Sequence, residues 1–187
     1  PNGIILVTGP TGSGKTTTLY STLRQLATTE VNVCTIEDPI EMVEPLFNQM
    51  QVQPNIDLSF SSGIKALMRQ DPDIIMIGEI RDLETAEMAT QAALTGHLVL
   101  STLHTNDAPS TITRLIELGV PSYIIKATVL GVMAQRLVRT LCPKCKEPHP
   151  IDEEAWKSIT APWRAPLPQN TCRPVGCLEC RDTGYKG

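Results

Sequence analysis

The sequence predicts an α/β fold, in which a predominantly parallel β-sheet is flanked by helices and followed by a small irregular subdomain. Strand-like apolar runs alternate with helical patterns through residues 1–141, as expected of a parallel sheet covered by helices. A glycine-rich loop joins the first of these strands to the first helix. After Leu141 the composition changes, because residues 142–187 hold seven of the 15 prolines, five of the six cysteines and both tryptophans. We therefore expect a core domain over residues 1–141 and, over residues 142–187, a small subdomain with little apolar core of its own.

Each element of the core domain is predicted from its own pattern. Short β-branched and apolar runs predict four strands, at Ile4–Thr8, Val31–Ile36, Ile74–Ile77 and Leu98–Leu103. Helical periodicity predicts helices near residues 15–28, 61–70, 82–95 and 108–118. Asn106 and Asp107 precede the last of these helices, where a side-chain oxygen caps free backbone N–H groups. A further helix, facing the core, is expected from about Ser122 to Thr140, because its apolar positions are Ile124, Ile125, Val129, Leu130, Val132, Met133 and Leu137.

The bulk properties limit the classes of partner. The net charge of the 187 residues is −4 and the pI is near 5.4, so no general attraction to nucleic acid or to an anionic membrane is expected. No apolar run approaches the roughly 20 residues needed to span a bilayer. The chain begins at Pro1, directly before the first strand, and ends at Gly187 without an obvious final element. We therefore expect a piece of a longer protein, with the small subdomain incomplete at its C-terminal side.

The glycine-rich loop has the G-x-x-x-x-G-K-[ST] pattern of a phosphate-binding loop. It lies between an apolar strand and a helix, which is the context that this motif requires, although a chance match to a Gly/Ser/Thr-rich turn is the alternative. Backbone N–H groups would surround a triphosphate, Lys15 would reach its β- and γ-phosphates, and the Thr16 hydroxyl would ligate Mg²⁺. The candidate nucleotide-binding residues of the loop are Gly9, Thr11, Gly12, Ser13, Gly14, Lys15, Thr16 and Thr17.

Acidic residues follow two of the predicted strands. A hydrolase of this kind needs carboxylates to organise Mg²⁺ and to orient water. The strand Ile74–Ile77 ends in Gly78-Glu79, so it offers only Glu79. A second cluster, with Glu37, Asp38 and Glu41, follows the strand Val31–Ile36 and would face the same crevice, because parallel strands end on the side of the phosphate loop. The alternative is a solvated acidic turn.

Two histidines bracket the strand Leu98–Leu103. His104 follows its far end and could contact the γ-phosphate or the attacking water. His97 precedes its near end, remote from that crevice, where it could contact a neighbouring element instead. Several arginines have two interpretations: Arg69 and Arg81 as surface ion-pair partners, and Arg114, Arg136 and Arg139 as contacts to the nucleotide of an adjacent subunit.

Four cysteines form two C-x-x-C pairs, Cys142 with Cys145 and Cys177 with Cys180, separated by 31 residues. Two such pairs can hold one tetrahedral Zn²⁺, and four sulfur ligands would leave no open position, so the site would be structural. Two disulfides or redox-active pairs are the alternative. Cys172 is a spare thiol and a rival ligand, whereas Cys34 lies in a predicted strand and is expected to be a small buried residue.

These blocks together resemble a known family. The phosphate loop Gly9–Thr17, the acidic block Thr35–Glu41, the run Arg69–Asp82 and the histidine block Thr95–Asn106 resemble the cytoplasmic ATPases of bacterial type II secretion and type IV pilus assembly. Gln135-Arg136-Leu137-Val138-Arg139, followed by Cys-Pro-x-Cys, is similar to the secretion and pilus-extension branch, whose members have the four-cysteine unit. The resemblance covers essentially the whole chain.

The resemblance implies a RecA-like, Mg²⁺-dependent ATPase domain that works as a hexameric ring. It implies that Glu41 is the catalytic base and that Glu79 helps to organise Mg²⁺ and its waters. It also implies that His97 and His104 belong to a histidine box that couples the γ-phosphate state to the contacts between subunits. It also implies an N-terminal domain upstream, which contributes arginines to the ATP site. The implied partners are an inner-membrane platform protein and a cytoplasmic adaptor, which place the protein in the cytoplasm at the inner membrane.

Three other functions remain open on the sequence. A nucleic-acid-translocating ATPase would share this core, but the acidic pI and the absence of interleaved basic and aromatic residues oppose it. A guanine-nucleotide switch is opposed by the lack of an Asn-Lys-x-Asp sequence. The last alternative is a zinc scaffold with a vestigial nucleotide site.

Overall fold

The computed structural model describes residues 2–163 and 165–186. The chain divides into two compact units, one up to Leu137 and the other from Val138 onward. None of the helices in the described ranges combines the length and the apolar character needed to cross a bilayer.

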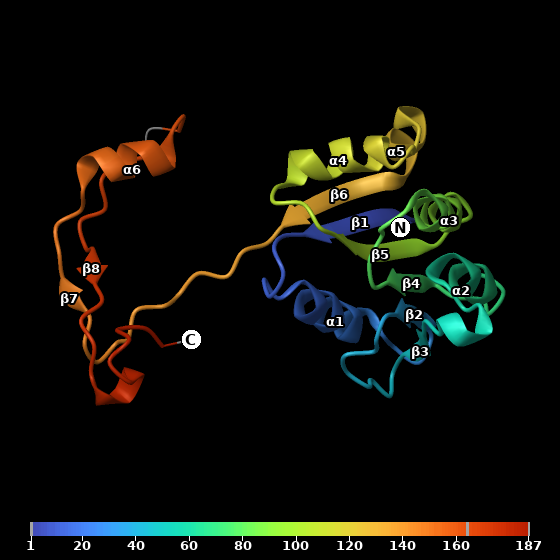
Figure 1. The fold of residues 1–187 in the computed structure, drawn as a ribbon, viewed down its shortest axis with the longest axis horizontal. Helices are drawn as coiled ribbons and strands as arrows, with labels where there is room; N and C mark the ends of the chain where they lie inside the picture. Colours follow the sequence, from blue (N-terminus) through green and yellow to red (C-terminus); the bar gives the residue numbers. More distant parts are fainter. Residues whose placement is uncertain (1, 164, 187) are drawn as a thin grey trace. The chain divides into compact units, whose positions relative to one another are not determined.

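The first unit is built on a six-stranded sheet (Figure 1). Its strands are β1 (Gly3–Thr8), β2 (Val33–Glu37), β3 (Asn48–Gln51), β4 (Ile74–Ile77), β5 (Leu98–Leu103) and β6 (Val129–Ala134). Their order in space is β3-β2-β4-β5-β1-β6, and every neighbouring pair is parallel. The predicted α/β class with a parallel sheet is therefore confirmed, and the carboxyl ends of all six strands lie at one edge.

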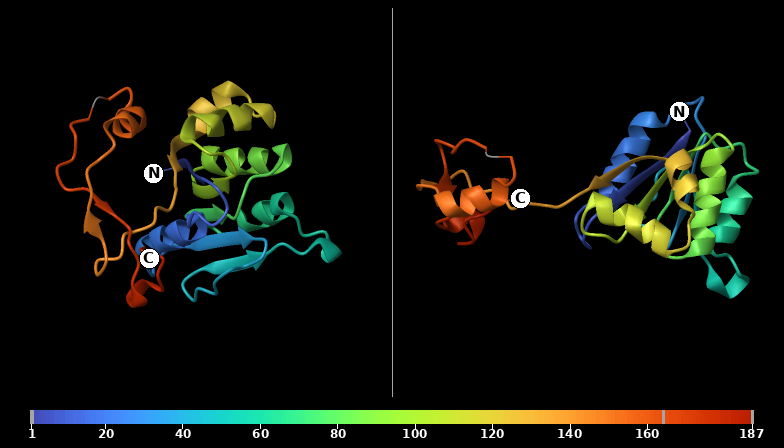
Figure 2. Two further views of the ribbon diagram at one scale, coloured as in Figure 1. Left: turned by 60° about the vertical axis from the view of Figure 1, so that its left-hand side comes forward. Right: turned by 90° about the horizontal axis from the view of Figure 1, so that it is seen from above.

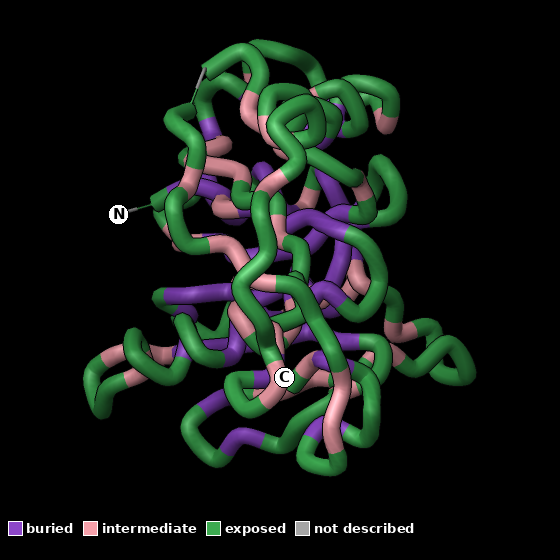
Figure 3. Tube along the Cα trace, turned by 90° about the vertical axis from the view of Figure 1, so that its left-hand side faces the viewer, coloured by how far each residue is buried: buried purple, intermediate pink, exposed green. Residues whose placement is uncertain are grey.

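The helices of this unit are α1 (Lys15–Leu26), α2 (Phe60–Leu67), α3 (Leu83–Leu94), α4 (Ala108–Glu117) and α5 (Ser122–Thr128), with a 3₁₀ turn at Pro54–Ile56. One face of the sheet is covered by α1 and the other by α2 to α5 (Figure 2). Alternate strand residues supply the two apolar clusters, since Ile75 and Ile77 pack with α2 and α3 while Ile74 and Met76 pack with α1. The four inner strands, β1, β2, β4 and β5, are accordingly almost continuous buried segments (Figure 3).

The predicted helix over residues 122–140 is wrong. The helix α5 ends at Thr128, and the next residues form β6, which pairs with the edge of β1. Val129 and Val132 do pack on the core, but Leu130 and Met133 are 56% and 43% exposed and Leu137 is 69% exposed. The apolar run fits a helix and a strand equally well, and β1, which would otherwise be a sheet edge, offers it backbone hydrogen bonds that a local pattern cannot reveal.

The strand β3 was not expected from the sequence. Its four residues, Asn48 to Gln51, are mostly polar and partly exposed, and it lies at the other edge of the sheet. An edge strand with one solvent-facing side needs few apolar residues, so it lacks the pattern that identifies the buried strands.

The second unit has little regular structure. Its elements are the helix α6 (Glu153–Thr160), the short antiparallel pair β7 (Glu147–Pro148) and β8 (Cys172–Arg173), and a 3₁₀ turn at Leu178–Cys180. Arg139 stacks 3.8 Å from the centre of the Tyr185 ring, and Leu141 forms a bridge with Tyr185. Among its described residues only Cys142, Cys180 and Gly184 are buried. An apolar core this small cannot by itself hold the unit together.

Candidate functional site

The phosphate loop connects the carboxyl end of β1 to α1, which begins at Lys15. Gly14 occupies the N-cap position with φ of 84°, a left-handed conformation that glycine adopts without strain. The Lys15 ammonium reaches back across the loop and donates to the carbonyl oxygens of Gly9 and Pro10 at 2.9 and 3.1 Å. The loop is thus closed around a positive charge at the N-terminus of a helix.

The loop has the features of an anion site. The first turn of α1 contains no acidic residue and no side chain caps its N–H groups. The Ser13 hydroxyl is buried and has no hydrogen-bond partner among the described residues. Uncapped N–H groups beside a lysine at a helix N-terminus fit a bound phosphate chain.

A cavity of about 510 Å³ lies in front of the loop at the carboxyl edge of the sheet. It brings together residues from the phosphate loop and from the ends of β2, β4 and β5. Most of the candidate residues line it: Thr11, Gly12, Gly14, Lys15, Thr16, Thr17, Glu37, Asp38, Glu41, Glu79 and His104. The structure therefore brings together residues that lie up to 93 positions apart in the sequence, from Thr11 to His104. Two predicted nucleotide-binding residues, Gly9 and Ser13, are not among the residues that line the cavity.

The carboxylates in this cavity differ in their surroundings. Glu79 is 9% exposed and pairs with Arg81 on one oxygen and with His104 Nε2, at 3.0 Å, on the other. Its hydrogen bond to Arg81 raises the pKa of that guanidinium above its ordinary value. Arg81 also lies 4.0 Å from Asp38. In contrast, Glu41 is exposed and makes no ion pair or side-chain hydrogen bond to the described residues, so its carboxylate is free to act on a ligand.

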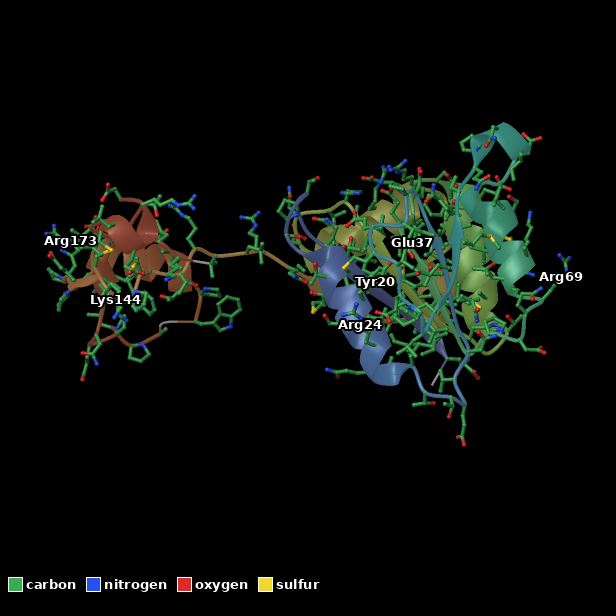
Figure 4. All side chains as sticks on the ribbon, turned by 90° about the horizontal axis from the view of Figure 1, so that it is seen from below. Tyr20, Arg24, Glu37, Arg69, Lys144 and Arg173 are labelled. Atoms are coloured by element: carbon green, nitrogen blue, oxygen red, sulfur yellow. The ribbon has the colours of Figure 1, made fainter. Side chains whose placement is uncertain are left out.

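Glu37 is a buried carboxylate that neutral donors hold in place. It is 3% exposed and accepts hydrogen bonds from Tyr20 at 2.7 Å, Thr35 at 2.6 Å and Gln49 at 3.3 Å. Tyr20 extends from α1 towards it (Figure 4). Burial, together with this carboxylate, raises the pKa of the Tyr20 hydroxyl, which stays a donor at neutral pH. Glu37 therefore has less freedom than Glu41 to contact a nucleotide directly.

His97 lies away from this cavity. It precedes β5, at the opposite edge of the sheet, and its Nδ1 lies 2.9 Å from the Ala92 carbonyl and 3.2 Å from the Thr95 hydroxyl. The expectation that it contacts a neighbouring element fits this position. Its assignment as a nucleotide contact finds no support within the chain, because the two ends of a strand lie at opposite edges of a parallel sheet.

The other expected polar residues are placed as follows. Asp107 caps α4 by accepting the Ser110 N–H at 2.8 Å, and this hydrogen bond lowers the pKa of the Asp107 carboxyl. Arg81 is an ion-pair partner, whereas the Arg69 side chain, within the part of the chain that the structure describes, bonds only to the Lys65 carbonyl, at 3.5 Å. Arg114 pairs with Glu117 at 3.4 Å.

Two site residues were missed by sequence reasoning, Tyr20 and Gln135. Gln135 follows β6 and bonds to the Ser13 carbonyl in the phosphate loop and to the Thr18 hydroxyl in α1. For Tyr20 the sequence signal was an aromatic residue in the helix after the loop, and for Gln135 it was a glutamine in the Gln135-Arg136-Leu137 block. Neither signal specifies a hydrogen-bond partner.

The four cysteines that were predicted to bind a metal lie together in the second unit. Their sulfur atoms all lie within 4.8 Å of one another. The measured separations are 4.0 Å for Cys142 to Cys177 and 3.8 Å for both Cys145 to Cys180 and Cys177 to Cys180. A Zn–S bond of about 2.3 Å gives a tetrahedron with edges of about 3.8 Å, whereas a disulfide needs about 2.0 Å. The geometry fits one tetrahedral metal and not two disulfides.

Backbone donors also favour thiolates at this cluster. The Gly176 N–H lies 3.3 Å from Cys145 Sγ, and the N–H groups of Cys177 and Gly184 each lie 3.2 Å from Cys180 Sγ. Burial opposes ionisation, but these last two donors, together with hydrogen bonds from Cys145 and Cys177, lower the pKa of Cys180 to about 6. At Cys145 burial outweighs the Gly176 N–H and raises the pKa of the thiol to about 11. Cys172 lies in β8, outside the cluster, and Cys34 is buried in β2 as expected, where burial raises the pKa of its thiol.

Comparisons with known proteins identify the family to which this chain is similar. The family model described as "Type II/IV secretion system protein" matches residues 1–187. The chain is 68% identical over 186 residues to the "Type IV pilus assembly ATPase TfpB" of Acinetobacter baylyi, and 54% identical over 187 residues to the "Type II secretion system ATPase E" of Vibrio cholerae. These alignments cover all of this chain but only 32% and 37% of those proteins, so the chain spans about a third of the length of these relatives.

A solved structure agrees with the fold. The crystal structure of "the Pilus Retraction Motor PilT and Bound ADP" is 41% identical, with a TM-score of 0.67, over 76% of this chain and 44% of that one.

Proposed function

The chain belongs to the type II/IV secretion system protein family, and from that premise we propose that it is the ATP-hydrolysing part of a motor for pseudopilus or pilus assembly. The observation that carries the proposal is the cavity lined both by the phosphate loop and by Glu41 and Glu79 from two other strand ends. Phosphoryl transfer to water needs this combination of phosphate ligands and carboxylates in one place.

The loop residues would bind and orient the nucleotide. The ammonium of Lys15, held at the loop by two carbonyls, would exchange those contacts for β- and γ-phosphate oxygens. Thr16 and Glu79 would hold Mg²⁺, directly and through its waters. Magnesium supplies charge neutralisation on the phosphate oxygens when it is bound.

The unequal surroundings of the two carboxylates support a division of roles. Glu79 is oriented by Arg81 and His104, which suits a residue that must keep a fixed position. Glu41 lines the cavity without an ion pair or side-chain hydrogen bond to the described residues, and a general base must be free to accept a proton from water. We therefore assign Glu41 as the base and Glu79 as the organiser of Mg²⁺, with His104 beside Glu79 towards the γ-phosphate.

This assignment is tested by ATP hydrolysis and nucleotide binding in the full-length, assembled protein. Glu41→Gln should lower kcat by about 10²–10⁴-fold, the usual worth of general-base assistance, while nucleotide affinity changes little. Lys15→Ala should instead weaken nucleotide binding. Glu30→Gln is the matched control, because it makes the same chemical change at an exposed glutamate outside the cavity. Near-normal turnover in Glu41→Gln would overturn the assignment.

The four-cysteine cluster is proposed to hold one structural Zn²⁺. Its sulfur separations and N–H donors support this, and metal binding of about 10–16 kcal/mol in zinc-finger peptides would replace the missing apolar core. Metal analysis should find one zinc per chain. Cys142→Ser should lose it, whereas Cys172→Ser, at a cysteine outside the cluster, should keep it. The proposal would be refuted if the protein were isolated in active form without zinc and with its cysteines oxidised.

The remaining properties follow the family and are proposals for the whole protein. They are a hexameric ring, an inner-membrane platform protein and a cytoplasmic adaptor as partners, a cytoplasmic position at the inner membrane, and no nucleic-acid partner. Hydrolysis stimulated by a polynucleotide, with a steep salt dependence, would favour a translocase instead.

A further inference from the structure

Gln135 is the first residue after β6, and its backbone N–H donates to the Thr8 carbonyl at 2.8 Å. Its side chain therefore starts from a fixed point beside the phosphate loop. The amide nitrogen Nε2 donates to the Ser13 carbonyl at 2.8 Å, and the amide oxygen Oε1 accepts from the Thr18 hydroxyl at 2.8 Å. One planar amide group thus joins the loop to the helix that follows it.

The loop backbone lies directly against Gln135. A Cβ atom at Gly9 would overlap the Gln135 carbonyl oxygen, and one at Gly14 would lie 3.1 Å from Nε2. Two glycines of the motif therefore allow the close approach of this residue, in addition to any approach of a phosphate. The contact is part of how the loop is held.

The bond to Ser13 fixes the direction of a loop amide. The peptide bond between Ser13 and Gly14 is planar, so its carbonyl and its N–H point in opposite directions. Holding the Ser13 carbonyl on Nε2 therefore keeps the Gly14 N–H turned away from Gln135, and Gly14 lines the nucleotide cavity. If this peptide rotated, a carbonyl oxygen would replace an N–H on the side where a phosphate needs donors.

We propose that Gln135 is a positioning residue for the phosphate loop, which holds the Ser13–Gly14 peptide in its anion-binding orientation by bonding Ser13 and Thr18 at once. This inference rests on the proposed function, because an oriented loop matters only if the loop binds phosphate. Gln135 touches the loop and not the reacting atoms, so its effect falls on nucleotide binding more than on the chemical step.

The test compares nucleotide affinity and steady-state kinetics in the full-length protein. Gln135→Ala should raise the Kd for ADP and the KM for ATP by on the order of 10-fold, the worth of one to two hydrogen bonds, and lower kcat by less than about threefold. Gln91→Ala is the matched control, since Gln91 is an exposed glutamine on α3 outside the cavity and should leave both unchanged.

Two further substitutions keep the inference testable if Gln135→Ala does not fold. Gln135→Glu keeps the size and the acceptor for Thr18 but puts an oxygen against the Ser13 carbonyl, so it should also weaken ADP binding. Thr18→Val removes the second bond and should weaken binding by about threefold to fivefold, whereas Thr18→Ser keeps the hydroxyl and should restore it.

The outcomes separate this inference from the proposed function. If the unaltered protein binds ATP and the three disruptive substitutions leave Kd and KM within twofold, Gln135 does not position the loop and the inference is wrong. A loss confined to kcat would also overturn it. If the unaltered protein binds no nucleotide, the proposed function itself fails.

Discussion

Removing the hydroxyl of Tyr20 tests whether the buried Glu37 network holds the acidic segment to α1. In Tyr20→Phe the ring stays, and so do its burial and its contact with Phe47, whose ring centre lies 5.7 Å away. Only the oxygen is lost. The carbonyl of Met42, which Tyr20 also contacts at 3.0 Å, keeps a donor in Gln49 at 2.9 Å. Gln49 Nε2, which donates to the Tyr20 hydroxyl at 2.9 Å, keeps the Met42 carbonyl and Glu37 Oε1 as acceptors. The uncompensated loss therefore falls on the other carboxylate oxygen of Glu37.

The size of the effect follows from burial and charge. Glu37 is 3% exposed, and the lost bond, at 2.7 Å, is the one hydrogen bond to its Oε2 among the described residues. A hydrogen bond to a charged group contributes about 1.5–3 kcal/mol, and solvent cannot readily replace it at a buried site. For a protein of this length, each kcal/mol shifts the melting midpoint by about 2–4 °C. We expect Tyr20→Phe to melt roughly 3–12 °C lower.

The assay is thermal unfolding followed by circular dichroism, with Tyr123→Phe as the matched control. Tyr123 is 70% exposed, so loss of its hydroxyl should change stability by less than about 0.5 kcal/mol. If Tyr20→Phe melted within a degree of that control, the reasoning would fail, and Glu37 would be satisfied by Thr35 and Gln49 alone.

Three other measurements test separate parts of the structure. Gly63→Ala should lower the free energy of unfolding in urea by about 1–2 kcal/mol, because the new Cβ would overlap Ile36 Cδ1 in the core and this overlap outweighs the gain in helix propensity. Gly131→Ala is the control, since no atom lies within 4 Å of its new Cβ and no overlap destabilises it. Burial raises the pKa of Tyr20 above 10.0, so the folded protein keeps a proton that the unfolded chain loses. The contribution of Tyr20 to the free energy of unfolding should therefore be fully present below about pH 10. Above that pH the free energy of unfolding should fall, more steeply than in Tyr20→Phe. A zinc chelator should expose the segment from Val138 onward to limited proteolysis and leave the segment before it resistant; equal protection with and without chelator would contradict a structural metal.

Much of the fold could be predicted because its signals are local. The four buried strands and the helices around them were recognised from apolar runs and periodicity, and their bounds differ from the structure by only a few residues. The strands β6 and β3 could not be predicted in this way, because each segment becomes a strand only by pairing at an edge of the sheet. Local pattern is ambiguous wherever the hydrogen-bond partner lies far along the chain.

The sequence by itself determined the phosphate loop and the two cysteine pairs, since fixed spacing over a few residues is enough to specify the chemistry of each. Only the tertiary structure decided that Glu37 is held by Tyr20 while Glu41 stays free, and that Gln135 bonds the loop from 117 and 122 positions away. The physical reason is that a carboxylate or an amide takes its role from the donors and acceptors around it, and folding brings those neighbours from distant strands.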